Sequence, residues 1–480
     1  MLCAVLLAGC TLGPDFVRPA APDVPRYTRE EQVEGTEIAQ GISQRFAHGT
    51  ALQSDWWRLF RSPALDAAVE QALAGNPTLQ AAEASLRVAQ DNLRAGDAVF
   101  YPQLTAGSSV ERERNAPVQQ GSSAGGTVFS LRTLSASVSY PLDVFGGERR
   151  TVERLGALVD VQRQARRAAF LTLTANVVNA CIAHAAYQAQ IRAMEALVAL
   201  ETEQLRGIEA QVRTGTVPYA NLLSQRSLIA GNQALLAPLR QKSSQAAHLL
   251  AQLQGQPPTR SAPPAIAFAS LVLPAELPLS VPSELARQRP DILASEAQLP
   301  AASADIGVTT AALYPSFSLN ATYGTASNSL SGLFGAAGRF WSVGPTLLAP
   351  LLDGGRLRAQ RQAARDAFDA TEANYRQTVL AAFAQVADVL KALEHDAQAL
   401  QALAASEQDA REALSLLQSS YRAGLTPYVD VQAADAQFHT ASIATLQAAA
   451  QRYQDTVALF AALGGGWWNP SDASRKDALP

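Results

Sequence analysis

The chain has 480 residues and a formal net charge of −4; 48% of its residues are hydrophobic, but only 6% are aromatic. Much of the apolar share is alanine, and small side chains let helices approach closely, so the composition favours a long helical assembly over a globular core. The sequence lacks the basic patch typical of nucleic-acid binding and any acidic tail. It also lacks a run of about 18 apolar residues, so we expect no transmembrane helix.

The N-terminus indicates a lipoprotein signal. An apolar run ends in Leu-Ala-Gly-Cys, which is similar to a bacterial lipobox, so residues 1–9 are predicted to be removed and Cys10 to carry lipid. An ordinary signal peptide with an incidental cysteine is the alternative. Either kind of signal peptide should begin with Lys or Arg, and the absence of both before Cys10 is a departure from the pattern. By similarity to lipoprotein sorting rules, Thr11 favours the outer membrane. Cys181 is expected to be a small buried residue, and the mature chain to lack disulfides.

The rest of the chain is duplicated. Five short markers recur at a nearly constant offset, which predicts two copies of a unit of roughly 200 residues. Such pseudo-symmetry favours a wall or a channel over a pocket. The markers are Pro77…Glu83 with Pro290…Glu296, Tyr101-Pro102 with Tyr314-Pro315, Gly146-Gly147 with Gly354-Gly355, Gly215-x-x-Pro218-Tyr219 with Gly424-x-x-Pro427-Tyr428, and Leu253 and Gly255 with Leu463 and Gly465.

Each repeat contains two runs in which apolar and polar residues alternate. In one of them, Leu134, Ala136 and Val138 alternate with serines. Runs of roughly ten residues with one apolar and one polar face, flanked by aromatic residues, are typical of transmembrane β-strands, although half-buried strands of soluble sheets alternate in the same way. Four strands cannot close a barrel, so strands that span a membrane would require oligomerisation. Strands are predicted at about 102–113, 128–142, 315–325 and 340–351.

Long helical hairpins are predicted after the strands. Arg356 to Ala423 contains neither Gly nor Pro, and at ~1.5 Å per residue it would form a helix of about 100 Å. Its apolar residues follow the spacing of a coiled-coil seam. Gly suits the end of each long helix and Pro the start of the next, whereas Pro238 and Pro300 should kink or break theirs. The predicted organisation is a signal at 1–9, a lipid-anchored strap at 10–62, repeat 1 at 63–260 with helices 148–213 and 219–254, a Pro-rich linker at 261–282, repeat 2 at 283–466 with helices 356–423 and 427–463, and a tail at 467–480.

Duplication, strands, hairpins and lipobox together resemble the TolC-like outer-membrane factors of tripartite efflux systems, in their OprM/NodT-type lipoprotein branch. The motifs that carry the resemblance are Arg289-Pro290-Asp291, Asp305-Ile306-Gly307, Leu352-Asp353-Gly354-Gly355 and Ala462-Leu463-Gly464-Gly465-Gly466-Trp467.

The resemblance implies a mainly α fold with a transmembrane β part, in which two internal repeats each supply two strands and long coiled-coil hairpins. It implies a homotrimer with a 12-stranded β-barrel continuous with a 12-helix periplasmic α-barrel. It also implies an outer-membrane channel that conducts drugs or other small amphipathic compounds. The implied partners are a periplasmic adaptor and an inner-membrane pump, usually of the resistance-nodulation-division class.

The same resemblance implies a pore constriction just after the second turn, at Val429, Asp430 and Ala433. Only Asp430 of the usual acidic set is present, and Asp435, displaced by half a turn, is not given that role. Three copies of Asp430 would form a negative ring that favours cations. Alternatively, Asp430 lies in the first turn of a helix, where a carboxylate interacts favourably with the helix dipole.

Closure in the family also uses a tyrosine of one hairpin bonded to an aspartate of the other. Tyr421 matches the tyrosine, whereas the neutral Asn221 occupies the aspartate position, so a weaker lock is expected; packing in the coiled-coil seam is the alternative role for Tyr421. The turns resemble adaptor-docking surfaces, although turn chemistry alone would explain their Gly and Pro residues. They comprise Gly215, Thr216, Val217, Pro218, Gly424, Leu425, Thr426 and Pro427.

Catalytic chemistry is not indicated. The histidines have no spacing suited to a metal, and the chain has no Gly-x-Ser-x-Gly motif or phosphate-binding loop, so we expect no enzyme activity and no cofactor besides the lipid. Transport would then be passive and driven by the partner pump. An exit duct of a type I secretion system and a periplasmic helical scaffold without a pore remain the alternatives.

Overall fold

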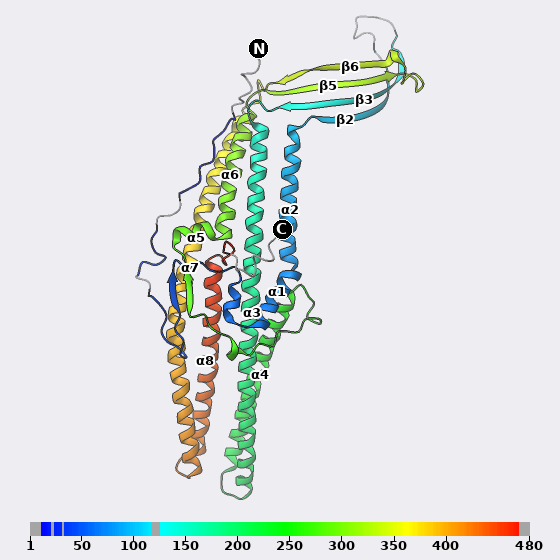
Figure 1. Cartoon of the computed structure of the whole chain (residues 1–480). Coiled ribbons are helices and arrows are strands. Elements are labelled where there is room, and N and C mark those ends of the chain that lie inside the picture. Colours follow the sequence, from blue (N-terminus) through cyan, green and yellow to red (C-terminus); the bar gives the residue numbers. More distant parts are fainter. Residues whose placement is uncertain (1–10, 21–23, 31–32, 115, 117–124, 470–480) are drawn as a thin grey trace. The chain divides into compact units, whose positions relative to one another are not determined.

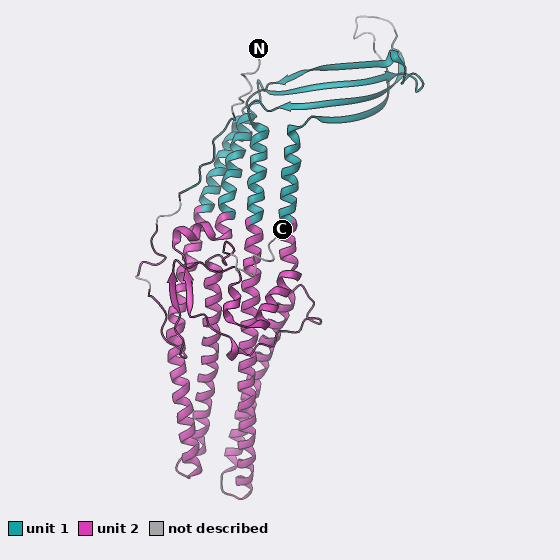
Figure 2. Cartoon of the chain, viewed as in Figure 1, with its two compact units in different colours: residues 1–19, 85–163, 294–375 teal, residues 20–84, 164–293, 376–480 magenta. Residues whose placement is uncertain are grey.

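The computed structural model describes residues 11–20, 24–30, 33–114, 116 and 125–469. The predicted signal at 1–9, Cys10 and most of the tail at 467–480 lie outside these residues. The chain divides into two compact units (Figure 2). Unit 1 contains residues 1–19, 85–163 and 294–375; unit 2 contains residues 20–84, 164–293 and 376–480.

Unit 1 contains a four-stranded antiparallel sheet in the order β2-β3-β5-β6 (Figure 1). Its register separates two faces. Leu104, Val138, Ala321 and Val343 lie opposite one another across all four strands. The next row along the strands consists of Thr105, Ser137, Thr322 and Ser342. Because successive side chains point to opposite faces, these rows give the sheet an apolar and a polar side. The strands are β2 (Gln103–Arg114), β3 (Val128–Leu142), β5 (Ser316–Ser327) and β6 (Arg339–Leu348).

The two outer strands of this sheet have open edges. Within the described residues, β2 pairs only with β3 and β6 only with β5. Every residue of β2 is exposed. β5 extends to Ser327 and β6 ends at Leu348, whereas these strands were predicted to end at about 325 and 351.

Helices lead into and out of the strands. α2 (Pro77–Asp97) precedes β2 and α6 (Pro290–Ala311) precedes β5, whereas α3 (Gly147–Arg213) follows β3 and α7 (Arg356–Arg422) follows β6. An aspartate accepts backbone N–H groups where each long helix begins. Asp143 accepts those of Glu148 and Arg149 at 3.1 and 3.0 Å, and Asp353 accepts those of Gly355 and Leu357 at 2.9 and 2.8 Å. These carboxylates satisfy amides that have no partner within the helix.

Unit 2 has a hydrophobic core made by segments far apart in sequence, which we call the central core and define by Trp56, Phe60, Ile182, Leu277 and Phe460. The ring of Trp56 lies 5.5 Å from that of Phe460 and 6.0 Å from that of Trp57, between centroids. A parallel pair, β1 (Arg45–His48) and β4 (Glu276–Leu279), joins the strap to the linker between repeats. The remaining elements here are η1 (Trp56–Phe60), α1 (Pro63–Gly75), η4 (Phe268–Ser270) and α5 (Pro282–Gln288).

Two antiparallel hairpins complete unit 2. α3 is followed by α4 (Tyr219–Leu253), and α7 by α8 (Tyr428–Ala462). α4 and α6 continue through Pro238 and Pro300, respectively. By length and composition, α3 could cross a membrane, contrary to the expectation from the sequence: an 18-residue window reaches a mean hydropathy of 1.4, but half of it is buried in the structure. Several apolar residues of α3, including Val177, Val178 and Ile182, pack in the central core.

Candidate functional site

The two hairpin turns lie side by side at one end of unit 2 (Figure 1). The Tyr421 hydroxyl on α7 donates a hydrogen bond to Oε1 of Gln211 on α3, at 3.3 Å. Beneath the turns, all four long helices contribute to a small apolar group, which we call the tip cluster. It therefore holds the hairpins together close to their ends. The buried members of the tip cluster are Ile208, Leu222, Leu414, Tyr428 and Val431.

The first turn of α8 separates buried from exposed residues. Val431 is buried in the tip cluster, whereas Val429 is 63% exposed, and Asp430 and Ala433 are exposed as well. The Asp430 N–H donates to the carbonyl oxygen of Pro427 at 3.2 Å, which places its carboxylate in the first turn. The side chains predicted to narrow a pore are thus accessible on one chain. A helix-dipole role for Asp430 requires the same position.

Tyr421 contacts a residue other than Asn221, the partner position that the family resemblance implied. Its hydroxyl bonds to Gln211, and its ring lies 5.1 Å from that of Tyr428 between centroids. Asn221 is partly buried in the first turn of α4, where its N–H donates to the carbonyl oxygen of Pro218. The Tyr421–Gln211 hydrogen bond, one of several between the hairpins, therefore joins two side chains without formal charge. The sequence offered no signal for Gln211, because its contact with α7 depends on how the hairpins pair.

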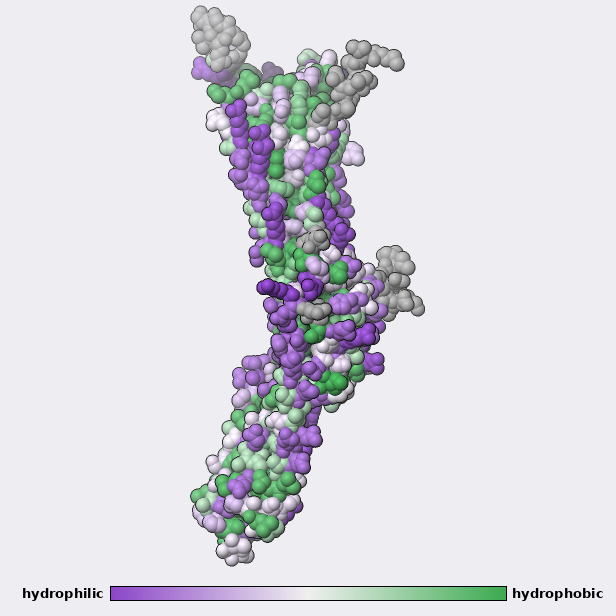
Figure 3. Space-filling view, turned by 90° about the vertical axis from the view of Figure 1, so that its left-hand side faces the viewer, coloured by the Kyte–Doolittle hydropathy of each residue, from purple (hydrophilic) through white to green (hydrophobic). Residues whose placement is uncertain are grey.

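The turns themselves are shaped by glycine. Gly215 and Gly424 have φ values of +76° and +74°, in the left-handed region that side chains with a Cβ rarely adopt. Pro218 and Pro427 then occupy the N-caps of α4 and α8. Most of the eight turn residues are exposed, with Leu425 at 78%, while Val217 and Thr426 are partly buried. On the face shown in Figure 3, apolar and neutral residues gather at this end of unit 2.

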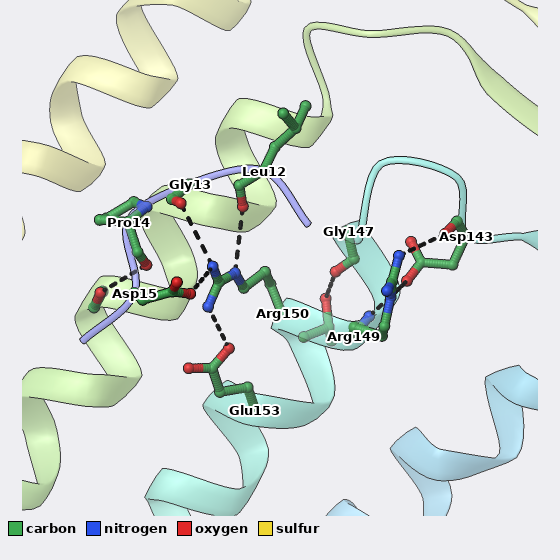
Figure 4. A network of polar contacts seen from close by, with 11 residues as sticks. Leu12, Gly13, Pro14, Asp15, Asp143, Gly147, Arg149, Arg150 and Glu153 are labelled. Carbon is green, nitrogen blue, oxygen red and sulfur yellow. Dashed lines mark hydrogen bonds and ion pairs between the residues drawn. The ribbon is translucent and has the colours of Figure 1, made fainter. Parts of the chain in front are cut away.

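A second polar arrangement, in unit 1, holds the segment that follows Cys10 (Figure 4). Arg150 on α3, whose side chain is only 4% exposed, donates to the backbone oxygen of Leu12 at 3.3 Å and forms ion pairs with Asp15 at 2.8 Å and Glu153 at 2.7 Å. The Leu12 N–H donates to the carbonyl oxygen of Phe145 at 3.1 Å. We call this arrangement the N-terminal clamp. It fixes the backbone two residues beyond the predicted lipidation site.

A glycine permits the close approach at the clamp. A Cβ at Gly307 would lie 2.7 Å from Cγ of Arg150 and 3.0 Å from the Leu12 carbonyl oxygen, closer than side chains normally pack. Gly307 belongs to the Asp305-Ile306-Gly307 motif, and the lack of space for a Cβ explains why this motif position is a glycine.

Comparison with known proteins identifies the family. A family model described as "Outer membrane efflux protein" matches residues 68–256 and 281–465, and so falls on both repeats. The chain is 31% identical to outer membrane protein OprJ of Pseudomonas aeruginosa, covering 97% of this chain and 95% of that protein.

Solved structures agree. The outer-membrane channel OprN superposes with a TM-score of 0.85 at 28% identity, covering 96% of this chain and all of that chain. The open state of the MtrE outer-membrane channel of Neisseria gonorrhoeae gives a TM-score of 0.82 at 26% identity, covering 96% and 99%.

The chain belongs to the outer membrane efflux protein family. The predicted TolC-like fold, mainly helical with a β part and two repeats, is confirmed by these matches. The predicted function, as an outer-membrane component of an efflux system, is confirmed as well.

One feature of this efflux protein was not anticipated from its sequence. Glu201 on α3 is 0% exposed and Asp435 on α8 is 3% exposed, and the two carboxyl groups, which belong to different hairpins, interact electrostatically. Oε2 of Glu201 and Oδ1 of Asp435 are buried without a hydrogen-bond donor among the described residues. We call Glu201 and Asp435 the carboxyl pair. Asn232 on α4 donates to Oε1 of Glu201 at 2.6 Å. Burial, and then the charge of Asp435, raise the pKa of Glu201 to about 7.

The sequence did carry a signal for Glu201. It follows Leu197 by four residues and precedes Ile208 by seven, and the side chains of Leu197 and Ile208 are both buried. Helical spacing would therefore have placed Glu201 on the inward face of α3. Asp435 likewise faces the interior, not the exposed side that carries Val429 and Asp430. In the part of the chain that the structure describes, the carboxyl pair included, no three His, Cys, Asp or Glu side chains are grouped to hold a metal ion.

Proposed function

We propose that this protein is a passive, non-enzymatic conduit, in which three copies close their sheets into one 12-stranded barrel and their hairpins into a 12-helix tube. The observation that carries the proposal is the sheet of unit 1, with its apolar and polar rows and its open edges at β2 and β6. Unpaired backbone groups in lipid cost several kcal/mol each, so a sheet of this kind must find partners for both edges.

We place the protein in the outer membrane, with a lipid on Cys10 as a second anchor. The N-terminal clamp supports this assignment, because Arg150 and the backbone of Phe145 hold the chain at Leu12, two residues after the predicted attachment point in the sequence. An anchored terminus held in one place would keep the lipid at a constant position relative to unit 1. The lipid would attach the protein to the membrane and would take no part in conduction.

The hairpin turns are the proposed docking surface for a periplasmic adaptor, which would connect the conduit to an inner-membrane pump of the resistance-nodulation-division class. The exposed Leu425 and the mixed apolar surface of this end support that assignment (Figure 3). The cargo would be drugs or other small amphipathic compounds. Opening would separate the hairpins at the Tyr421–Gln211 contact, and Asp430 would favour cations at the constriction.

Mass measurement and planar-bilayer conductance of the mature, full-length protein test the proposal together. We expect a trimer that forms discrete channels, and a reduced cation preference in Asp430→Asn. Asp409→Asn, which neutralises an exposed carboxylate of α7, should leave the cation preference unchanged. A monomer, or a trimer that forms no channel, would favour the helical scaffold, and export of a polypeptide in place of small compounds would favour the secretion duct.

A further inference from the structure

The carboxyl pair joins elements that must move apart if the tips open. Glu201 belongs to the α3/α4 hairpin and Asp435 to the α7/α8 hairpin, and both lie in unit 2. The same layer contains Gln225, which donates to the backbone oxygen of Glu201 at 3.0 Å and accepts from the Tyr428 hydroxyl at 2.8 Å. The pair is therefore part of a continuous polar contact between the hairpins.

The chemistry of two facing carboxyl groups requires a proton. An ionised carboxylate only accepts hydrogen bonds, so Glu201 and Asp435 can bond to each other only when one of them is protonated. Oε2 of Glu201 and Oδ1 of Asp435 are buried, and neither has a donor among the hydrogen bonds of the described residues. Two buried like charges this close cannot both persist at low cost. One shared proton supplies the missing donor and removes the repulsion.

The groups around the pair come from all four helices. α4 contributes the neutral Asn232 and Gln225, and α8 contributes Tyr428 and His439. On α7, Tyr421 stacks on Tyr428, and Arg411 pairs with Glu407 and lies over the Phe438 ring. The other nearby cations of the first hairpin are engaged as well, Arg206 with Glu203 and Arg226 with Glu209.

His439 is the base with direct access to the pair. Its Nε2 lies 3.4 Å from Oδ1 of Asp435, a distance at which a protonated imidazole would compete for the Asp435 charge. His439 is therefore the other group of this layer that contacts Asp435 directly, and a variant at this position separates its contribution from that of Glu201.

We propose that a proton shared between Glu201 and Asp435 latches the two hairpins together, and that loss of this proton releases them. This latch concerns only the packing of two hairpins within one chain and does not require that the protein form a pore. Its consequence for transport, closure in acid and easier opening at higher pH, rests on the proposed conduit.

The direction of the pH response follows from proton binding. Because the pKa of Glu201 is raised in the packed state, the packed hairpins hold a proton that separated, solvated carboxyl groups with ordinary pKa values near ~4.3 would release. The latch is complete below that ordinary value and weakens as pH rises toward about 7. Linkage to one proton changes the ratio of separated to packed hairpins by up to about tenfold per pH unit in this window.

Spin labels at the exposed positions Arg213 and Arg422, in full-length protein diluted with unlabelled copies, would report the separation of the hairpin ends. We expect a single short distance at about pH 5 and a growing population of longer distances toward about pH 8. Glu201→Gln, which keeps a donor for Asp435, should hold the short distance throughout. Glu203→Gln, an exposed carboxylate on the same helix, is the matched control and should respond as the unmodified protein does.

Three results would overturn the latch: a distance that does not change with pH in the unmodified protein, a response that survives Glu201→Gln, or a response abolished by His439→Gln in its place. Conductance of the same labelled protein separates this test from that of the conduit. A protein that conducts with a pH-independent distance refutes the latch alone. A pH-dependent distance in a protein that carries no current supports the latch and refutes the conduit.

Discussion

The central core and the tips of unit 2 are built on the same two hairpins, yet different forces hold them. In the central core, aromatic rings from η1 and α8 pack against aliphatic residues of α3 and the linker. At the tips, five buried residues of the described chain form the apolar part, and hydrogen bonds between Tyr and Gln side chains, together with the carboxyl pair, add polar contacts. Removal of any one buried apolar side chain lowers the free energy of unfolding, whereas a polar contact that breaks can be replaced by hydrogen bonds to water. We therefore expect the hairpins to be fixed in their middle and separable at their ends.

Removing an aromatic ring from the central core should have the largest effect. Phe460 is 0% exposed and contacts Trp56 and Phe60, so Phe460→Ala should destabilise the protein by about 3–5 kcal/mol. Denaturant unfolding followed by circular dichroism checks this. Leu416→Ala, at an exposed position on α7, is the control and should change stability by less than about 0.5 kcal/mol. Similar losses of stability in the two variants would contradict the claim that the central core holds the hairpins together.

A buried arginine offers the next largest effect. Arg452 on α8 donates to Oε1 of Gln44 at 3.0 Å, to Oγ1 of Thr36 at 3.0 Å and to the Ile42 carbonyl oxygen at 3.2 Å. Arg452→Met would leave Oε1 of Gln44 without a donor and would remove one of the donors to Thr36 and Ile42, at a cost of about 1–3 kcal/mol. Proteolysis within residues 33–48 should become faster. Arg422→Met, at an exposed position, should leave that rate unchanged; equal rates in the two variants would contradict the anchoring role of Arg452.

Acid should affect the two regions in opposite directions. Burial alone would raise the pKa of Asp291, but the hydrogen bonds and charge of Arg289 outweigh it and hold that pKa below its usual value. Arg289 also donates to the Ala462 carbonyl oxygen at 2.9 Å, so this ion pair supports the central core. Its contribution is present above the ordinary aspartate pKa and is lost as pH falls through the lowered value.

Glu201 has a raised pKa, so the tips should tighten as pH falls from about 7 toward the ordinary glutamate pKa of ~4.3, whereas the Arg289–Asp291 pair should loosen only at lower pH, below the ordinary aspartate pKa of ~3.9. Because Asp291 is partly exposed, the effect on unfolding free energy should stay below about 1 kcal/mol. Unfolding curves of Asp291→Asn, compared with the unmodified protein between about pH 3 and about pH 6, should converge at the acid end. A constant difference across that range would show that the pair does not titrate with folding.

The smallest expected effect is at the Tyr421–Gln211 contact. Tyr421→Phe removes one neutral hydrogen bond near the surface, worth about 0.5–1 kcal/mol, and keeps the aromatic ring that packs against the tip cluster. The population of separated hairpins, measured with the same spin labels, should rise a few-fold. Tyr219→Phe, on the exposed start of α4, serves as the control. A larger opening in the control would show that the Tyr421 hydroxyl does not hold the tips.

Local patterns predicted the elements because each depends on residues near in sequence. The alternation around Leu134, the Gly-x-x-Pro turns and the seam spacing of Val386, Leu390 and Leu393 are visible in short windows, and these seam residues are buried in the structure. The duplication, together with family resemblance, gave the arrangement of repeats.

Contacts between the hairpins could not be predicted in the same way. The partners Gln211 and Tyr421, and Glu201 and Asp435, are separated by about two hundred residues, and which of them meet depends on the vertical register of one hairpin against the other. Periodicity fixes the face on which a residue lies but not its height against a distant helix. The N-terminal clamp was missed for a related reason, since a strap without periodic structure has no register to extrapolate.

Hydrogen exchange along α3 in the full-length protein tests the central claim most directly, because one helix passes through both regions. We predict that amides of residues 198–213, near the tip, exchange at least about tenfold faster than those of residues 177–190 in the central core. After correction for the intrinsic pH dependence of exchange, only the tip segment should lose protection between about pH 6 and about pH 8. Equal protection along the helix, or loss of protection in both segments together, would contradict the account.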